Sequence, residues 1–137
     1  MTTKIIEITA EQAIPIRHKV MWPNQPLEFV KLPEDDKGLH YGLYVDDQLT
    51  SIISLFINGK EAQFRKFATL EAYQGQGFGS MLLNEIMHIA NTKKLKRIWC
   101  NARQNKSDYY TKFNMTKMNT TYVKGGIDFV IMERIFQ

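Results

Sequence analysis

The sequence lacks the features that mark disulfide-bonded, secreted or membrane-spanning proteins. Cys100 is the single cysteine among 137 residues, so the chain can form no internal disulfide. There is no run of about 18 apolar residues, the length that a membrane helix needs. The first residues carry no apolar signal region. These absences predict a cytoplasmic protein without a membrane partner.

Charge of neither sign is concentrated in a long block. The net charge is +4, and the densest basic run, residues 93–97, falls where a helix is predicted to end and cations are favoured. We therefore interpret this run as a solvated helix terminus and predict no nucleic-acid partner, although the positive charge suits an anionic ligand. His18, His40 and His88 are not at metal-ligand spacing, so we predict no metal.

The length predicts one domain over residues 1–137, long enough to bury a core. Apolar residues make up 44% of the chain and charged residues 23%, which is typical of an ordinary globular protein. Cys100 lies in an apolar strand pattern, so we interpret it as a buried, inert thiol rather than a nucleophile.

Hydrophobic periodicity and turn residues predict an α/β (α+β) chain with one mixed sheet and helices on its faces. The predicted strands are Lys4–Ile8, Leu39–Val45, Leu49–Ile57, Ala62–Leu70, Lys96–Ala102, Met115–Lys124 and Ile127–Phe136. Helices are predicted from Thr9 or Ala10 to Met21, from about Gly77 to Lys93 and after Asn105, while Leu27–Pro33 is either a short helix or irregular. A helix joins strands 62–70 and 96–102, so these two strands should run parallel.

Single residues refine these elements. The longer helix should bury Phe78, Met81, Leu82, Ile86, Ile89 and Ala90. Asn105 should cap the short helix with Asp108 as its partner, and Asn114 stands where a left-handed helix stop would fall. Gly125 and Gly126 predict a hairpin between the last two strands.

The most informative stretch lies between the predicted strand at 62–70 and the long helix. It consists of Gln74, Gly75, Gln76, Gly77, Phe78, Gly79 and Ser80. Glycines allow sharp turns and close approach, and the first amides of a helix have no internal partner, so this stretch is a candidate cradle for phosphate. It lacks the Lys-Ser or Lys-Thr of a P-loop and has one residue, not two, between its second and third glycines, which departs from the dinucleotide fingerprint. The alternative is a glycine-rich turn that only starts a helix.

Two motifs resemble those of the GNAT superfamily of acyl-CoA N-acyltransferases. Gln74, Gly77 and Gly79 match the pattern Gln/Arg-x-x-Gly-x-Gly/Ala. The stretch Tyr109-Tyr110-Thr111-Lys112-Phe113-Asn114-Met115 fills the frame Phe/Leu-Tyr-x-Lys-Leu-Gly-Phe, with asparagine and methionine in place of its glycine and last phenylalanine. A weaker similarity to the ElaA-like branch lies in Ile16–Val20 followed by Asn24-Gln25, and in Ala102-Arg103.

The resemblance implies a GNAT fold, with a mixed central sheet of about seven strands and about four helices. It implies an N-acetyltransferase that transfers an acetyl group from acetyl-CoA to a primary amine of a small molecule or peptide, by direct attack in a ternary complex and without a metal. The sheet would splay between strands 62–70 and 96–102. The cofactor-binding residues that it implies are Phe67, Ala68 and Thr69, the stretch 74–80, and Tyr109.

The resemblance also implies catalytic and acceptor-binding residues. Tyr110 would protonate the departing CoA thiolate, although the two tyrosines on their own could be core or rim aromatics. Arg17 is predicted to bind an anionic or strongly polar group of the acceptor, with an ordinary helix-surface role as the alternative. Some members carry a glutamate base on the fourth strand, but this chain has no carboxylate there past Glu61, so the base would be a water chain, His40 or Glu28.

Two other functions stay open at this point. A non-catalytic acyl-CoA-binding regulatory module would keep the glycine stretch, and the missing glutamate favours it. A basic nucleic-acid-binding domain would bind in a strongly salt-dependent way and ignore CoA. The sequence leaves the acceptor amine unidentified and a homodimer open.

Overall fold

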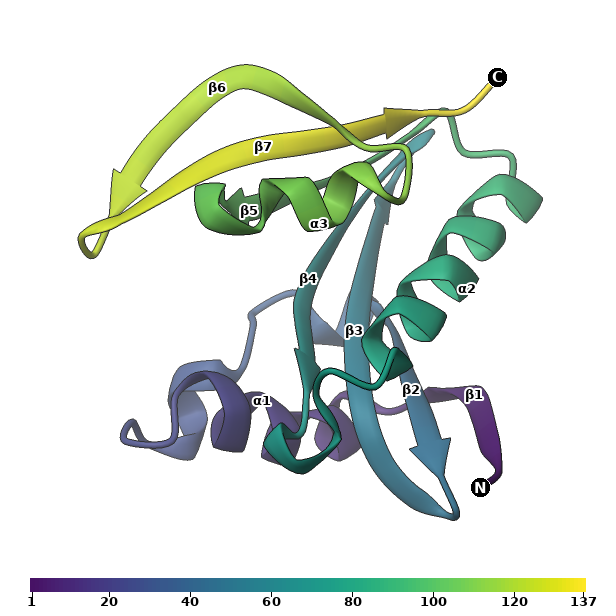
Figure 1. The fold of residues 1–137 in the computed structure, drawn as a ribbon, viewed down its shortest axis with the longest axis vertical. Coiled ribbons are helices and arrows are strands. Elements are labelled where there is room, and N and C mark those ends of the chain that lie inside the picture. The colour runs from purple at the N-terminus through teal and green to yellow at the C-terminus, as the bar shows by residue number, and fades with distance from the viewer.

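The computed structural model describes all 137 residues and is built around one seven-stranded sheet (Figure 1). The strand order is β1-β2-β3-β4-β5-β7-β6, and every neighbouring pair is antiparallel except β4 and β5, which are parallel as predicted. The strands are β1 (Thr3–Ile8), β2 (Leu39–Val45), β3 (Gln48–Asn58), β4 (Glu61–Thr69), β5 (Arg97–Arg103), β6 (Thr116–Lys124) and β7 (Ile127–Ile135).

Three α-helices and four short 3-10 turns complete the fold. The helices are α1 (Ala10–Met21), α2 (Phe78–Thr92) and α3 (Ser107–Thr111), and the turns are Leu27–Val30, Asp35–Lys37, Glu71–Tyr73 and Gln104–Lys106. The segment 27–33, predicted as a short helix or irregular, thus contains one of the turns. None of the helices is both long and apolar enough to cross a membrane.

The two faces of the sheet carry separate cores, because successive side chains of a strand point to opposite faces. Ile52 of β3 belongs to a small cluster with residues of α1, and its neighbour Ile53 belongs to the main core of 22 buried residues. The main core includes the buried side of α2, and the tyrosines of α3 pack against it. Helix α1 therefore covers one face, and α2 and α3 cover the other.

Local capping decides where the helices begin. Thr9 caps α1, where its hydroxyl accepts a hydrogen bond from the Gln12 amide at 3.1 Å and the Gln12 side chain accepts from the Thr9 amide at 2.8 Å. Asn114 has φ +63° after α3, which confirms the predicted left-handed stop. Gly125 and Gly126 both have positive φ in the turn between β6 and β7, as predicted.

Two local predictions are wrong. Met81 is 41% exposed, and the buried stripe of α2 is instead Phe78, Leu82, Leu83, Ile86, Met87 and Ala90. The stripe includes Leu83 and Met87, so the side of α2 that packs on the core is turned away from Met81. The predicted Asn105 cap does not form. Asn105 lies within a 3-10 turn, α3 has Lys106 at its cap position without a side-chain bond, and Ser107 Oγ donates to the Gln104 carbonyl at 2.9 Å.

Candidate functional site

The glycine stretch leads directly into the N-terminus of α2. Gly75 and Gly77 have φ of +75° and +87°, a region that residues with a side chain rarely adopt. Gly77 is the cap residue of α2, and no side chain caps the helix. The first main-chain hydrogen bond of the helix runs from Met81 N to Gly77 O at 3.0 Å, so the amides of residues 78–80 have no acceptor within the helix. These amides and the helix dipole can bind an anion.

Gly79 brings this helix start against the end of β4. A Cβ at Gly79 would lie 3.2 Å from Thr69 Oγ1 and 3.4 Å from the Phe67 ring, so a larger residue would push the helix away. Gln74 Nε2 donates to the Thr69 carbonyl at 2.9 Å, which holds the loop to the same strand end. The Thr69 hydroxyl is in turn fixed by Ser51 Oγ at 2.9 Å.

The sheet opens between β4 and β5. Only Glu61–Gln63 of β4 pair with Arg97–Trp99 of β5, although β4 continues to Thr69 and β5 to Arg103. Figure 1 shows β5, β6 and β7 diverging from β4 beyond this point. The main-chain groups of residues 67–69 that face the opening therefore have no partner on β5, and they can pair with an extended ligand.

A β-bulge interrupts β4 at the start of its open segment. Ile52 pairs with Ala68 but Ser54 pairs with Arg65, so Lys66 and Phe67 together oppose Ile53. Lys66 has φ +56°, which is uncommon for a residue with a long side chain. The sequence prediction missed this bulge, although the adjacent polar residues Arg65 and Lys66 break the strand alternation and could have indicated it.

The two tyrosines of α3 lie near this opening, and they differ in their contacts. The Tyr109 hydroxyl is 2.9 Å from Ser80 Oγ, so it joins α3 to the start of α2. The Tyr110 ring is 5.9 Å from that of Phe64, the first β4 residue beyond the last pair with β5. The Tyr110 hydroxyl forms no hydrogen bond with the protein, and it is not among the fully covered side-chain atoms without a partner, so it keeps some contact with solvent.

Burial raises the pKa of two groups near the opening, the Tyr110 hydroxyl and the Cys100 thiol. The pKa of Tyr110 is raised by burial first and then by Cys100 and Tyr109, so its hydroxyl stays protonated well above neutral pH. Burial raises the pKa of Cys100 to about 12. Cys100 is buried as predicted, and at neutral pH it holds its proton and is a poor nucleophile.

Arg17, which was predicted to bind the acceptor, is buried inside the protein. The side chain is 0% exposed, and its guanidinium donates to the Asp35 carboxylate at 2.8 and 2.9 Å. It also donates to Ser54 Oγ at 3.0 Å and to the Val30 carbonyl at 3.1 Å. With no exposed surface and four bonds inside the protein, Arg17 ties the segment after α1 to the sheet and cannot contact an acceptor directly.

The bonds of Arg17 extend to two other charged groups. Burial alone would raise the pKa of Asp35, but the hydrogen bonds from Arg17 and the Leu32 amide and the charges of Arg17 and His40 lower it below its ordinary value. His40 is also buried, with Nδ1 2.7 Å from Ser54 Oγ and Nε2 2.9 Å from the Asp35 carbonyl. Both nitrogens of His40 are therefore engaged, which leaves none for an acceptor amine.

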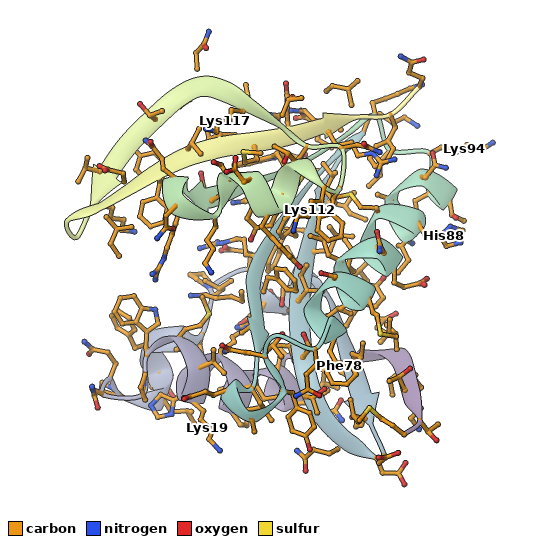
Figure 2. The ribbon with its side chains drawn as sticks, viewed as in Figure 1. Lys19, Phe78, His88, Lys94, Lys112 and Lys117 are labelled. Carbon is orange, nitrogen blue, oxygen red and sulfur yellow. The ribbon has the colours of Figure 1, made fainter.

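We expect the substitution Arg17→Met to lower the free energy of unfolding by about 3 kcal/mol, because it leaves the mostly buried Asp35 carboxylate without its counter-charge. Urea denaturation followed by circular dichroism measures the loss. Lys19→Met is the matched control, since Lys19 lies exposed on the same helix (Figure 2) and should change stability by less than about 0.5 kcal/mol. Equal stability of the two variants would contradict the structural role of Arg17.

The other proposed base, Glu28, lies in the turn after α1. Its side chain is 79% exposed and its carboxylate is 2.7 Å from Lys31 Nζ. An exposed ion pair of this kind contributes little to stability. The Glu28 side chain forms its hydrogen bond and ion pair with Lys31 and none with β4 or α3.

Most of the residues predicted to hold a cofactor meet in one place. Contacts of the β4 end, the glycine stretch and α3 bring together Phe67, Thr69, Gln74, Gly79, Ser80 and Tyr109. Three other predicted residues lie elsewhere. Ala68 is buried on the side of the sheet that α1 covers, and Phe78 at the start of α2 (Figure 2) is buried in the main core. Gln76 is exposed, and its side chain donates to the Ala72 carbonyl. Tyr110 lies over the opening, and Arg17 lies outside this group.

A polar hollow of about 550 Å³ lies at the far end of the opened part of β5. It is lined by Arg103, Gln104, Asn105, Gly126, Ile127 and Asp128. Figure 1 places the tip of the β6–β7 hairpin on the same side of the molecule as the segment after α1. This side is opposite to α2 in Figure 1.

Comparison with known proteins adds to this geometry. Residues 7–136 match the family model of the acetyltransferase (GNAT) domain. The chain is 31% identical over 129 residues to an uncharacterized N-acetyltransferase of Bacillus subtilis, YitI, and the match covers 88% of this chain and 87% of that protein.

Solved structures share the fold at low sequence identity. The ribosomal-protein-S18-alanine N-acetyltransferase of Escherichia coli has a TM-score of 0.84 at 15% identity, with 98% of this chain and 94% of that chain covered. A GNAT family acetyltransferase of Elizabethkingia anophelis, solved with acetyl-CoA bound, has a TM-score of 0.76 at 17% identity, with 98% of each chain covered. Escherichia coli ElaA has a TM-score of 0.77 at 16% identity, with 97% of this chain and 98% of that chain covered.

Proposed function

The chain belongs to the GNAT family of acyl-CoA-dependent N-acetyltransferases, and from this premise we propose that it acetylates a primary amine of a small molecule or peptide by direct attack in a ternary complex. The observation that carries this proposal is the opening between β4 and β5 beside the uncapped start of α2. An extended thioester fits such an arrangement, with its anionic part at the helix and its reactive part between the strands.

The residues present fit acetyl-CoA. The amides of residues 78–80 would bind the pyrophosphate, and Gly79 leaves room between helix and strand that a Cβ would fill. The main chain of residues 67–69, which has no partner on β5, would hold the pantetheine arm in strand fashion, next to the Thr69 carbonyl that Gln74 binds. A protein of the same fold from Elizabethkingia anophelis was solved with acetyl-CoA bound, which supports this choice of ligand.

Acetyl-CoA supplies an activated carbonyl whose sulfur leaves as a thiolate. In the proposed reaction the amine nitrogen bonds to the carbonyl carbon, the carbon–sulfur bond breaks, the sulfur keeps the bonding electrons and the amine loses a proton. The protein would contribute mainly by holding the amine close to the carbonyl and by hydrogen bonds to the charge that develops. Tyr110, whose hydroxyl has no other partner, is the proposed donor to the sulfur.

The proton of the amine is proposed to leave through water in the opening. No carboxylate follows Glu61 on β4, His40 has both nitrogens engaged, and Glu28 is an exposed partner of Lys31. A water chain is therefore the acceptor that the placement of these residues favours.

A thiol-release assay with acetyl-CoA and a panel of amines tests the proposed function. We expect CoA thiol to appear in proportion to enzyme for at least one primary amine, and the acetylated product to be seen by mass spectrometry. Tight binding of acetyl-CoA without release for any amine would favour the non-catalytic module. Absence of acetyl-CoA binding together with salt-sensitive binding to DNA or RNA would favour the nucleic-acid alternative.

A further inference from the structure

Lys66 differs from every other lysine or arginine that is not exposed. Arg17, Arg65 and Arg97 form ion pairs with carboxylates. Arg134 donates to the Phe113 carbonyl at 3.3 Å. Lys66 is half-buried but forms neither an ion pair nor a hydrogen bond, and its amine is not fully covered, since Arg17 Nε is the single buried side-chain atom without a partner.

The backbone places Lys66 beside the reactive part of the proposed site. It is the bulge residue of β4, three positions beyond the last pair with β5 and directly before the segment that would hold the pantetheine arm. Its φ of +56° departs from strand geometry, and a bulge of this kind redirects a side chain out of the regular alternation. Such conformations are kept mainly where the surrounding structure or function requires them.

The charges around Lys66 are mostly of its own sign. Burial lowers the pKa of Lys66, and the cations Arg65, Arg17 and Lys124 lower it further, while Asp35 alone acts in the other direction. Asp35 is already held by two bonds from Arg17. Lys124 ends β6 at the hairpin tip and Arg17 lies in α1, so cations of both elements act on Lys66.

We propose that Lys66 binds an anionic group of the acceptor, so that the enzyme prefers primary amines that also carry a carboxylate. This proposal rests on the proposed acetyl transfer and assigns its acceptor class. The geometry that carries it is a half-buried, unpaired ammonium at a bulge within the part of β4 that is not paired with β5. An acceptor carboxylate would supply the direct ion-pair partner that no residue of the chain provides.

Matched acid and amide acceptors test this specificity. The series is glycine, β-alanine, 4-aminobutyrate and 6-aminohexanoate, each compared with its carboxamide in the thiol-release assay. We expect at least one acid to exceed its amide in kcat/KM by about 10–100-fold, because a charge-assisted hydrogen bond is lost in the amide. The spacing that gives the largest ratio measures the distance from Lys66 to the reacting carbonyl.

Substitutions then assign the preference to Lys66. Lys66→Gln should reduce the acid-to-amide ratio to about one through a higher KM for the acid, and Lys66→Arg should restore part of the ratio. Lys94→Gln is the control, because Lys94 also has positive φ, +59°, but is exposed at the end of α2, far from the hairpin tip (Figure 2). It should leave the ratio unchanged.

A second readout does not depend on turnover. In protein labelled with ¹³C at the lysine ε-carbons, the Lys66 signal is identified by its loss in Lys66→Gln. In the presence of CoA, 6-aminohexanoate should shift this signal and 6-aminohexanamide should not, and the Lys94 signal should stay in place. A shift with the acid alone supports the carboxylate site even if no amine of the panel is acetylated.

Several results would overturn the proposal. Acids and amides acetylated equally, with no effect of Lys66→Gln, would refute it and leave the acetyltransferase function intact. An equal loss of kcat for both classes in Lys66→Gln, with an altered pH profile, would make Lys66 a proton acceptor instead. A Lys66 signal that responds to neither ligand would exclude binding at this residue.

Discussion

Replacing Gly77 with valine is expected to weaken acetyl-CoA binding by about 10³-fold while the fold persists. Gly77 has φ +87° at the cap of α2, a conformation that a β-branched residue adopts only at a cost of about 1–3 kcal/mol. The variant should therefore rearrange the loop, and two or three hydrogen bonds to the pyrophosphate would be lost at about 1.5–3 kcal/mol each. Calorimetry measures the affinity, and circular dichroism measures the fold.

A matched control separates loss of the cradle from simple backbone strain. Gly125 also has positive φ, +59°, and nothing lies within 4 Å of its Cβ position, but it is in the β6–β7 turn. Gly125→Val should lower stability to a similar degree and leave acetyl-CoA affinity nearly unchanged. Gly79→Val should weaken binding for a different reason, because its side chain would meet Thr69 and Phe67. Unchanged affinity in a folded Gly77→Val variant would remove the basis of the proposed cofactor site.

The sequence predicts the parts of this fold that depend on neighbouring residues. The parallel pairing of β4 and β5 follows from the helix between them, and the hairpin at Gly125–Gly126 follows from the need for positive φ. The cap of α2 at Gly77 belongs to the same class, because the loop geometry demands a glycine there. In each of these cases the residues that indicate the structure and the element that they specify lie within about 30 residues of each other in the sequence.

Long-range ion pairs could not be predicted in the same way. Arg17 lies four residues after Ala13 and three before Val20, so its spacing places it on the apolar side of α1 although its charge favours the surface. Asp35 belongs to a stretch, residues 34–38, that has the composition of a polar loop. Their pairing depends on the path of residues 22–38 back over the sheet, which no local pattern specifies. The prediction therefore placed a binding arginine where the fold uses a buried structural one.

Our proposal for substrate recognition keeps an anionic acceptor but assigns its binding to a different cationic residue. An anionic acceptor was predicted from Arg17, and we propose Lys66 in its place because the Lys66 ammonium has no ion-pair partner and lies at the β4 bulge. The charges of Arg17 and Asp35 both act on Lys66, but the Asp35 carboxylate is already bonded to Arg17. The buried pair thus contributes to keeping Lys66 free.

The substitution Tyr110→Phe is expected to lower kcat by about 10²–10⁴-fold with acetyl-CoA affinity little changed. It removes only the hydroxyl that is proposed to donate to the departing thiolate, and the ring packing against Phe64 should remain. Because burial raises the pKa of Tyr110 above its ordinary value of about 10, far above that of a thiol at about 8.5, full proton transfer to sulfur would be uphill. Tyr110 should therefore act mainly by hydrogen-bond donation.

The pH dependence and a neighbouring tyrosine distinguish this role from packing. Since the pKa of Tyr110 is raised, the donor is present throughout the neutral and mildly alkaline range, and kcat should show no decline from its ionisation below about pH 10. Tyr109→Phe loses a 2.9 Å hydrogen bond to Ser80 but no proposed donor, so its effect on kcat should stay under about tenfold. Equal small losses in both variants would mean that the thiolate departs without help from a tyrosine, and water in the opening would then be the proton donor.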